Sequence, residues 1–151
     1  MISRKNWKEN SKSPEKGQSM VELALTITIL MILLAGVVDL GRAFFTYMAM
    51  RDAAQEGAAY GSINPYDVAG IKSRVWDNLE QVVSDPEKLT EDIVVGVGFN
   101  GPKRCIGYEI EINVDYKEFP LTMPFLGWIL NSQTIAIHAT IKDNILKPPC
   151  D

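Results

Sequence analysis

Four polar residues on two segments have types and spacing that could support acid–base chemistry or hold a metal. Glu109, Glu111 and Asp115 lie on one face of one predicted strand, and His138 lies on another strand. Paired carboxylates can exchange protons or bind cations. Alternating charges on a strand are usually only solvated, however, and His138 has no second histidine or nearby cysteine with which to bind a metal. We therefore expect no catalytic residue, no metal site and no cofactor.

The charge of the chain is unevenly distributed. The 151 residues carry a net charge of −4, of which residues 1–38 contribute +2 and residues 39–151 contribute −6. A strongly acidic larger part argues against nucleic acid as a partner, because phosphate binding needs a basic surface. No glycine-rich phosphate loop is present in the sequence either. We expect no nucleic acid and no small-molecule substrate.

An apolar segment follows a basic, polar segment over residues 1–17. Residues 23–38 are 16 uncharged residues, and a helix counted from Met20 would rise roughly 28 Å, close to the thickness of the hydrocarbon core. We predict a membrane span over residues 20–42, with the lipid bilayer as a partner. A buried core helix and a signal peptide cleaved near Ala35 are the less favoured alternatives.

The charges on either side of the span predict its orientation. By the positive-inside rule, the basic leader stays in the cytoplasm and the C-terminal domain lies outside the cytoplasmic (inner) membrane. Asp39 and Arg42 are spaced i and i+3 near the outer boundary. We expect these two side chains to pair with each other and to reach the lipid headgroups.

Glu22 is the one charge inside the start of the span. A carboxylate there costs about 2.5–3.5 kcal/mol at the centre of a membrane helix and less near the interface, so it calls for a partner. Residues 17–22 (GQSMVE) resemble a prepilin-type, or class III, leader, which a membrane peptidase cuts after the glycine. That resemblance implies cleavage between Gly17 and Gln18, and a contact between Glu22 and the ammonium group of a neighbouring subunit during assembly. The alternative is that Glu22 only extends toward the cytoplasmic headgroups.

Two further segments extend this resemblance beyond the span. Residues 38–44 (VDLGRAF) and 53–61 (AAQEGAAYG) resemble the TadE-like family, the minor pilin-like proteins of tight-adherence (type IVb) pilus systems. With the leader included, the resemblance covers residues 17–61. It implies a pilin-like fold, no enzymatic activity, and a prepilin-type peptidase and other pilin-like subunits as partners.

The helix that forms the span is predicted to continue over residues 18–61. Small residues recur at every fourth position in its second half, at Ala49, Ala53, Gly57 and Gly61. A stripe of small side chains lets another backbone approach closely. The partner of this stripe is either the helix of a neighbouring subunit or the protein's own sheet, and the spacing does not choose between them.

Residues 62–151 are predicted to form an extracytoplasmic α/β domain. Apolar spacing predicts a helix over residues 67–84, and period-two alternation predicts strands at 93–99, 106–117 and 135–142. The fold class is therefore α+β, with a long N-terminal helix, a second helix and a three-stranded antiparallel sheet. In the apolar segment 119–132, we expect Phe125, Trp128 and Ile129 to pack on the core rather than on headgroups or a neighbouring subunit.

The two cysteines, Cys105 and Cys150, both lie in the predicted outer domain. An even pair in an oxidising compartment favours a disulfide. The leading hypothesis for the whole chain is a non-catalytic, single-pass pilin-like (pseudopilin) subunit that takes part in assembling a tight-adherence pilus or secretion apparatus. An unprocessed membrane anchor for an outer domain and an anchored ligand-binding protein or enzyme are the alternatives. The sequence does not decide whether the subunit enters the filament.

Overall fold

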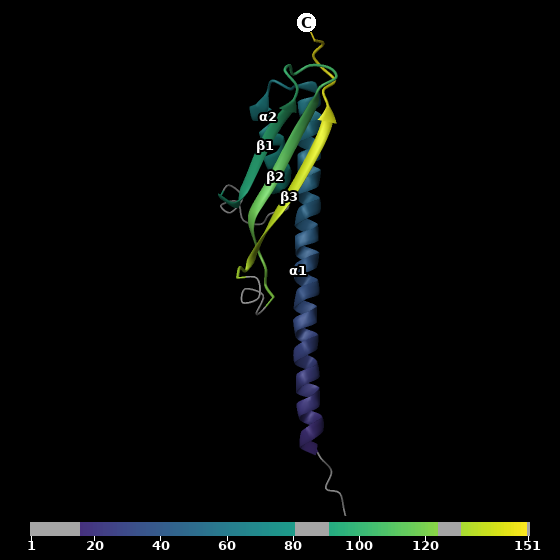
Figure 1. The fold of residues 1–151 in the computed structure, drawn as a ribbon, viewed down its shortest axis with the longest axis vertical. Coiled ribbons are helices and arrows are strands. Elements are labelled where there is room, and N and C mark those ends of the chain that lie inside the picture. Colours follow the sequence, from purple (N-terminus) through teal and green to yellow (C-terminus); the bar gives the residue numbers. More distant parts are fainter. Residues whose placement is uncertain (1–15, 81–90, 124–130, 151) are drawn as a thin grey trace, which may run out of the picture.

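The computed structural model describes residues 16–80, 91–123 and 131–150. Its elements in chain order are α1 (Lys16–Ile63), α2 (Val68–Glu80), β1 (Ile93–Asn100), β2 (Glu109–Pro120) and β3 (Thr134–Asn144). The predicted α+β fold, with a long apolar N-terminal helix, a second helix and a three-stranded antiparallel sheet, is confirmed. The sheet lies beside the C-terminal half of α1, and the N-terminal half of the helix extends away from it (Figure 1).

Hydrogen bonds at the end of α1 set the direction of α2. The Asn64 N–H donates to the Tyr60 carbonyl at 3.0 Å and closes the last helical turn. Asp67 caps α2, because its Oδ1 accepts the Gly70 N–H at 2.9 Å while its Oδ2 accepts the Tyr60 hydroxyl at 2.9 Å. These bonds, that of Gly70 first, hold the pKa of Asp67 below its usual value, and the same carboxylate raises the pKa of Tyr60.

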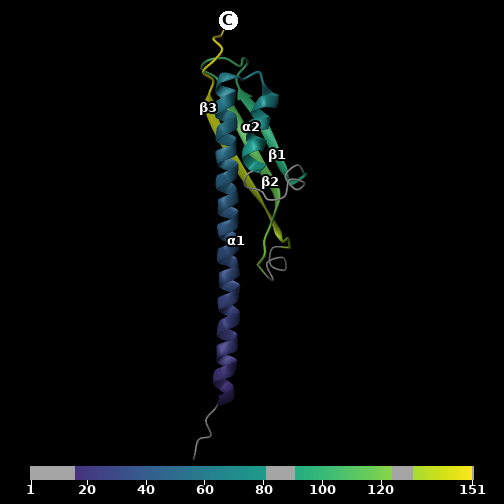
Figure 2. The same ribbon diagram turned by 180° about the vertical axis from the view of Figure 1, so that it is seen from behind.

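The three strands form one sheet in the order β1-β2-β3, and both neighbouring pairs are antiparallel. Val114 in the central strand pairs with Val95 on one side and with Ala139 on the other. Both helices lie on the same face of this sheet (Figure 2). The predicted alternation follows from this arrangement, because one face of each strand packs on the helices and the other faces outward.

The central strand differs from its prediction at both ends. It begins at Glu109 instead of residue 106, and Ile106 is exposed with its N–H bonded to the Pro148 carbonyl at 2.9 Å. Gly107 has a φ of 92°, a backbone conformation that does not continue a strand. The alternation of apolar and polar residues did not reveal this turn, because Ile106 is apolar and fits the same period of two as the strand that follows.

At its other end, β2 continues to Pro120 through a β-bulge. Tyr116 pairs with Ile137 and Phe119 pairs with Ile135, so two residues of β2 face one residue of β3. The extra residue reverses the alternation, and Phe119 therefore points into the core where Glu118 would otherwise have pointed. The predicted strand ended at residue 117 because its alternation stops there.

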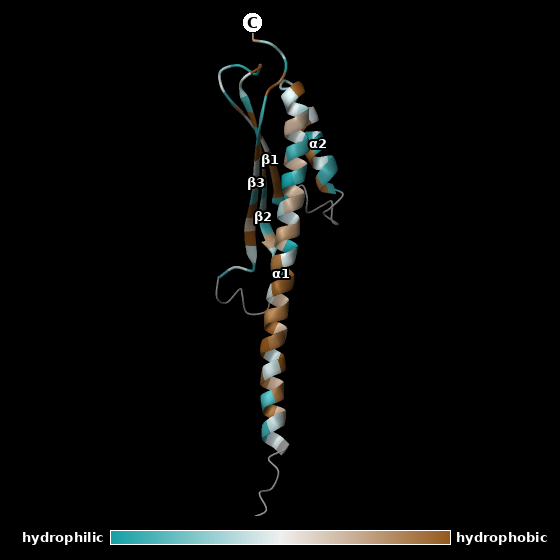
Figure 3. Ribbon diagram, turned by 90° about the vertical axis from the view of Figure 1, so that its right-hand side faces the viewer, coloured by the Kyte–Doolittle hydropathy of each residue, from teal (hydrophilic) through white to brown (hydrophobic). Residues whose placement is uncertain are grey.

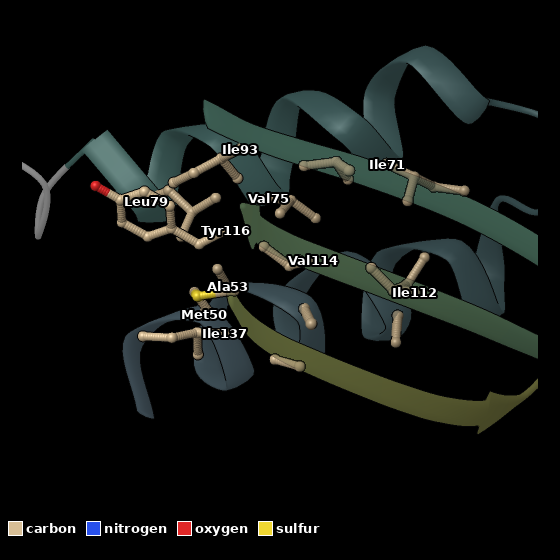
Figure 4. Packing of buried hydrophobic residues seen from close by; sticks show 14 of the residues in the cluster. Met50, Ala53, Ile71, Val75, Leu79, Ile93, Ile112, Val114, Tyr116 and Ile137 are labelled. Carbon is tan, nitrogen blue, oxygen red and sulfur yellow. The ribbon is translucent and has the colours of Figure 1, made fainter. Parts of the chain in front are cut away.

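The core lies between the inner face of the sheet and the two helices (Figure 4). Its buried side chains come from every element and are almost entirely aliphatic: Met50, Ala53, Ala54 and Ala58 from α1, Ile71, Val75 and Leu79 from α2, and Ile93, Val95, Ile110, Ile112, Val114, Tyr116, Phe119, Ile137 and Ala139 from the strands. The last part of the predicted helix 67–84 and the residues Phe125, Trp128 and Ile129 lie outside the described residues.

The stripe of small residues on α1 faces the protein's own fold. Ala53 and Gly57 are buried, and a Cβ atom added at Gly57 would collide with Cγ2 of Val75 in α2. A Cβ added at Gly61 would collide with Cδ1 of Ile110 in β2. Ala49 is half-buried at the lower end of the stripe. The spacing left two partners open for this stripe, a neighbouring subunit or the protein's own sheet. Within the described residues, the stripe packs on the protein's own α2 and sheet.

We expect Gly57→Ala to lower the free energy of unfolding by about 1–3 kcal/mol, because Val75 is β-branched and cannot rotate away from the added methyl group. Gly41→Ala is the matched control on the same helix, since a Cβ at Gly41 meets no atom within 4 Å. We expect this control to be neutral or to stabilise by up to about 1 kcal/mol. Guanidinium unfolding of the full chain in detergent, followed by circular dichroism, measures both values. Equal stability of the two variants would contradict the packing described.

Candidate functional site

The N-terminal half of α1 presents apolar side chains that the described part of the protein does not cover. The most apolar 18-residue window of this helix has a mean hydropathy of 2.5, and none of it is buried. Leu23, Met31 and Val37 are examples of its exposed large side chains. Figure 3 shows this hydrophobic stretch on the part of α1 that extends below the sheet. The helix is therefore long and apolar enough to cross a membrane, and its most apolar window takes no part in the described core.

Two threonines in this stretch have their hydroxyl groups satisfied within the helix. Thr26 donates to the Glu22 carbonyl and Thr28 donates to the Ala24 carbonyl, both at 2.8 Å. Such bonds to the preceding turn give the hydroxyl group of each threonine an acceptor. The two threonines are thus compatible with an apolar surrounding.

Gly17, Gln18 and Glu22 all lie in the first turns of α1. Together with Val21 and Leu25 they line a shallow, open concavity at the start of the helix. A Cβ added at Gly17 would meet no atom within 4 Å. Gln18 and Glu22 are one helical turn apart, so they share one face of the helix. The roles predicted for these three residues stay predictions.

Asp39 lies where the exposed part of α1 meets the sheet, and it is 3% exposed. Its Oδ2 accepts two backbone hydrogen bonds, from the Thr122 N–H at 2.7 Å and from the Met123 N–H at 2.6 Å. Its buried Oδ1 has no hydrogen bond and lies 3.5 Å from Nη1 of Arg42. A carboxylate with these partners fixes the chain that follows β2 against the helix.

Arg42 completes this junction from the other side. Its Nη1 donates to the Thr122 hydroxyl at 2.6 Å, and its guanidinium lies 5.5 Å from the centre of the Phe119 ring. The bulge in β2 is what turns Phe119 toward this position. The sequence predicted that Asp39 and Arg42 would both reach headgroups. In the structure Asp39 is instead directed into the protein, and only Arg42 stays half exposed.

Met123 extends the junction one helical turn further toward the N-terminus. A Cβ added at Gly36 would lie 3.0 Å from Cε of Met123, so the methionine rests directly on the helix backbone there. We call Gly36, Asp39, Arg42, Thr122 and Met123 the junction. Sequence reasoning found only Asp39 and Arg42, because Thr122 and Met123 carry no motif and lie 83 and 84 positions from Asp39.

Glu109, Glu111 and Asp115 of the central strand have partners on the neighbouring strands, across the outer face of the sheet. Lys142 lies 3.2 Å from Glu111, and its hydrogen bond is the main reason why the pKa of Glu111 is below its usual value. His138 Nδ1 lies 2.7 Å from Asp115. Glu109 accepts a hydrogen bond from Asn100 at 3.2 Å. Among the residues that the structure describes, no group of three or more histidine, cysteine or acidic side chains could hold a metal ion.

The predicted disulfide between Cys105 and Cys150 is confirmed, with the Cα atoms 5.2 Å apart. It joins the turn before β2 to the C-terminal segment, across 45 positions of sequence. A crosslink closing a loop of this length stabilises the fold by roughly 4 kcal/mol in the chain-entropy description. The Ser62 carbonyl also accepts the Leu146 N–H at 2.8 Å, which ties the same segment to the end of α1.

The resemblance found in the sequence can be compared directly with known families. Residues 17–59 match the model of the TadE-like protein family. This range covers most of α1, from the concavity around Glu22 to the stripe of small residues, and includes Asp39 and Arg42. The TadE-like resemblance predicted from the sequence is thereby confirmed over these residues. No curated protein and no solved structure matches the chain.

The TadE-like match and the apolar helix together fit a membrane-associated, pilin-like subunit of a tight-adherence system. The matched range ends before α2 and the sheet. The residues that hold Asp39, namely Thr122 and Met123, thus lie outside the TadE-like match.

We expect Asp39→Ala to raise the hydrogen-exchange rates of the Thr122 and Met123 amides by roughly tenfold, because both N–H groups lose their acceptor. In Asp39→Asn, which keeps one acceptor oxygen, these exchange rates should lie between those of Asp39→Ala and those of the wild type. Asp52→Ala is the control, since Asp52 is an exposed acid on the same helix. Hydrogen–deuterium exchange of the full chain in detergent, read by mass spectrometry, measures the rates. Unchanged exchange in Asp39→Ala would contradict the role given to this carboxylate.

Proposed function

We propose that the chain is a non-catalytic, single-pass pseudopilin that takes part in assembling a tight-adherence pilus or secretion apparatus. The main support for this proposal is that the family match and the uncovered apolar helix fall on the same residues. The segment that matches the TadE-like family is the same helix whose apolar half the described fold leaves uncovered. An exposed apolar helix of this length needs lipid, or the helices of other subunits, around it.

The proposed orientation places the basic residues 1–17 in the cytoplasm and the sheet outside the cytoplasmic membrane. The excess of lysine and arginine before the span supports this direction. The disulfide supports it as well, because such bonds persist in oxidising compartments. The partners that follow from the proposal are the bilayer, a prepilin-type peptidase and other pilin-like subunits.

Cleavage after Gly17 would place a new ammonium group close to Glu22. Gln18 would become the first residue, four positions before Glu22, which is about one turn and roughly 6 Å along the helix axis. Opposite charges in a low-dielectric surrounding offset part of each other's desolvation cost. In an assembly, the same carboxylate could instead take the ammonium of a neighbouring subunit and so set the axial register between the two helices.

Processing is tested by the intact mass of the membrane-extracted protein, expressed with and without an active prepilin peptidase. We expect the peptidase to remove residues 1–17 and expose Gln18. Gly17→Leu should block the loss, because a bulky side chain replaces the small residue before the scissile bond, and Ser13→Ala in the same leader should not. A chain that still begins at Met1 beside an active peptidase would favour the alternative of an unprocessed anchor.

The role of Glu22 is tested by co-purification with the other pilin-like subunits of the same system. We expect Glu22→Gln to reduce the recovered partners by about tenfold or more, since removing one charge leaves the opposite charge unpaired in an apolar surrounding. Leu25→Ala is the matched control, because Leu25 lies beside Glu22 at the same concavity without carrying a charge. Equal recovery with Glu22→Gln and with the wild type would exclude the register role and leave the membrane span unaffected.

A further inference from the structure

We propose that the lower end of the sheet rests on the outer surface of the lipid bilayer, which would reach up α1 as far as Phe44 and Phe45. The contact surface consists of the junction residues Thr122 and Met123 together with the outward face of α1 around Leu40 and Phe44. Its partner is the headgroup region of the outer leaflet. This inference rests on the membrane span in the proposed function, and it adds that the outer domain is itself a membrane-contacting body.

The first support is the depth at which the outer domain touches the helix. Met123 lies against Gly36, and Gly36 belongs to the uncharged run of residues 23–38. The 16 residues of that run rise only about 24 Å as a helix, less than the ~30 Å of a hydrocarbon core. A bilayer around this run therefore extends to the level of Gly36, where Met123 already lies.

The second support is the helix surface beyond the run. Leu40, Phe44 and Phe45 are 73%, 64% and 71% exposed, although Phe45 also lines a cavity with Tyr116 and Phe119 of β2. From Ala43 to Met50 the sequence carries no charge. Large apolar and aromatic side chains in water are unfavourable, whereas aromatic side chains are enriched where a helix leaves the bilayer.

The third support is the state of the two charges between these regions. The Asp39 carboxylate is buried and accepts two backbone hydrogen bonds, and the Arg42 guanidinium lies 3.5 Å from it. A paired and hydrogen-bonded carboxylate costs far less near the headgroups than a free one. The exposed half of Arg42 faces outward at the same level, where its charge suits lipid phosphate groups. The junction thus permits a bilayer boundary above Asp39.

The test uses single cysteine variants of the full chain. Both native cysteines are bonded to each other, so each of Leu30→Cys, Leu40→Cys, Phe44→Cys, Met123→Cys and Ile63→Cys offers one thiol for an environment-sensitive nitrobenzoxadiazole label. The labelled proteins are reconstituted into vesicles of phosphatidylcholine and phosphatidylglycerol that contain nitroxide lipids. Ile63 is the matched control, because it is also exposed, on the same helix, about 28 Å beyond Phe44.

We expect the labels at 40, 44 and 123 to have blue-shifted emission and to be quenched by the nitroxide lipids, as the label at 30 is, while the label at 63 is quenched by aqueous iodide. If Met123→Cys weakens the junction, positions 40 and 44 still give the answer, since neither takes part in it. A protected label at 30 together with water-exposed labels at 40 and 44 would overturn the inference and leave the span intact. A water-exposed label at 30 would overturn the span and the inference together.

A second copy of the chain, instead of lipid, could also shield Phe44 from water. Lowering the protein-to-lipid ratio of the vesicles distinguishes lipid contact from contact between copies, because lipid contact does not depend on how many copies each vesicle holds. Protection at 44 that disappears on dilution would overturn the inference in favour of subunit contact. Protection that stays constant would support the lipid surface as the partner.

Discussion

One continuous helix carries two different kinds of side chain along its length, and most of the fold follows from this change. Toward the N-terminus the side chains of α1 are large, apolar and uncovered by the described part of the protein. From Ala49 on, every fourth side chain is small, so that α2 and β2 approach its backbone closely at Gly57 and Gly61. Without this second half the sheet would lose one wall of its core, to which Met50, Ala53 and Ala58 contribute. The apolar half of α1 and the domain that contains the sheet therefore share one continuous helix.

The junction at Asp39 lies where the uncovered part of α1 meets the part that packs on the sheet. A buried carboxylate is tolerated only with hydrogen-bond donors around it, and the backbone after β2 supplies them. The bulge in β2 turns Phe119 inward just before these donors. The base of the sheet is thereby held at one height on α1.

Sequence patterns predicted the elements that depend on local order. The uncharged run, the helical spacing of Ile71, Val75 and Leu79, and the alternation in the strands each repeat over a few residues, and the structure contains the corresponding elements. The patterns failed where a single residue breaks a period. The turn at Gly107 and the bulge before Phe119 moved the bounds of β2. The alternation continues through the turn without a break, and at the bulge it stops although the strand continues.

The sequence by itself determined the apolar span, the charges on its two sides, the TadE-like segments and the pairing of the only two cysteines. These features depend on composition, on short spacings or on a single possible partner. Only the tertiary structure decided that the small stripe on α1 faces its own sheet and that Asp39 is held by Thr122 and Met123. Those partners lie 83 and 84 positions away in the chain. They bind Asp39 through backbone N–H groups, which every residue except proline has, so the residue types at 122 and 123 do not predict the contact.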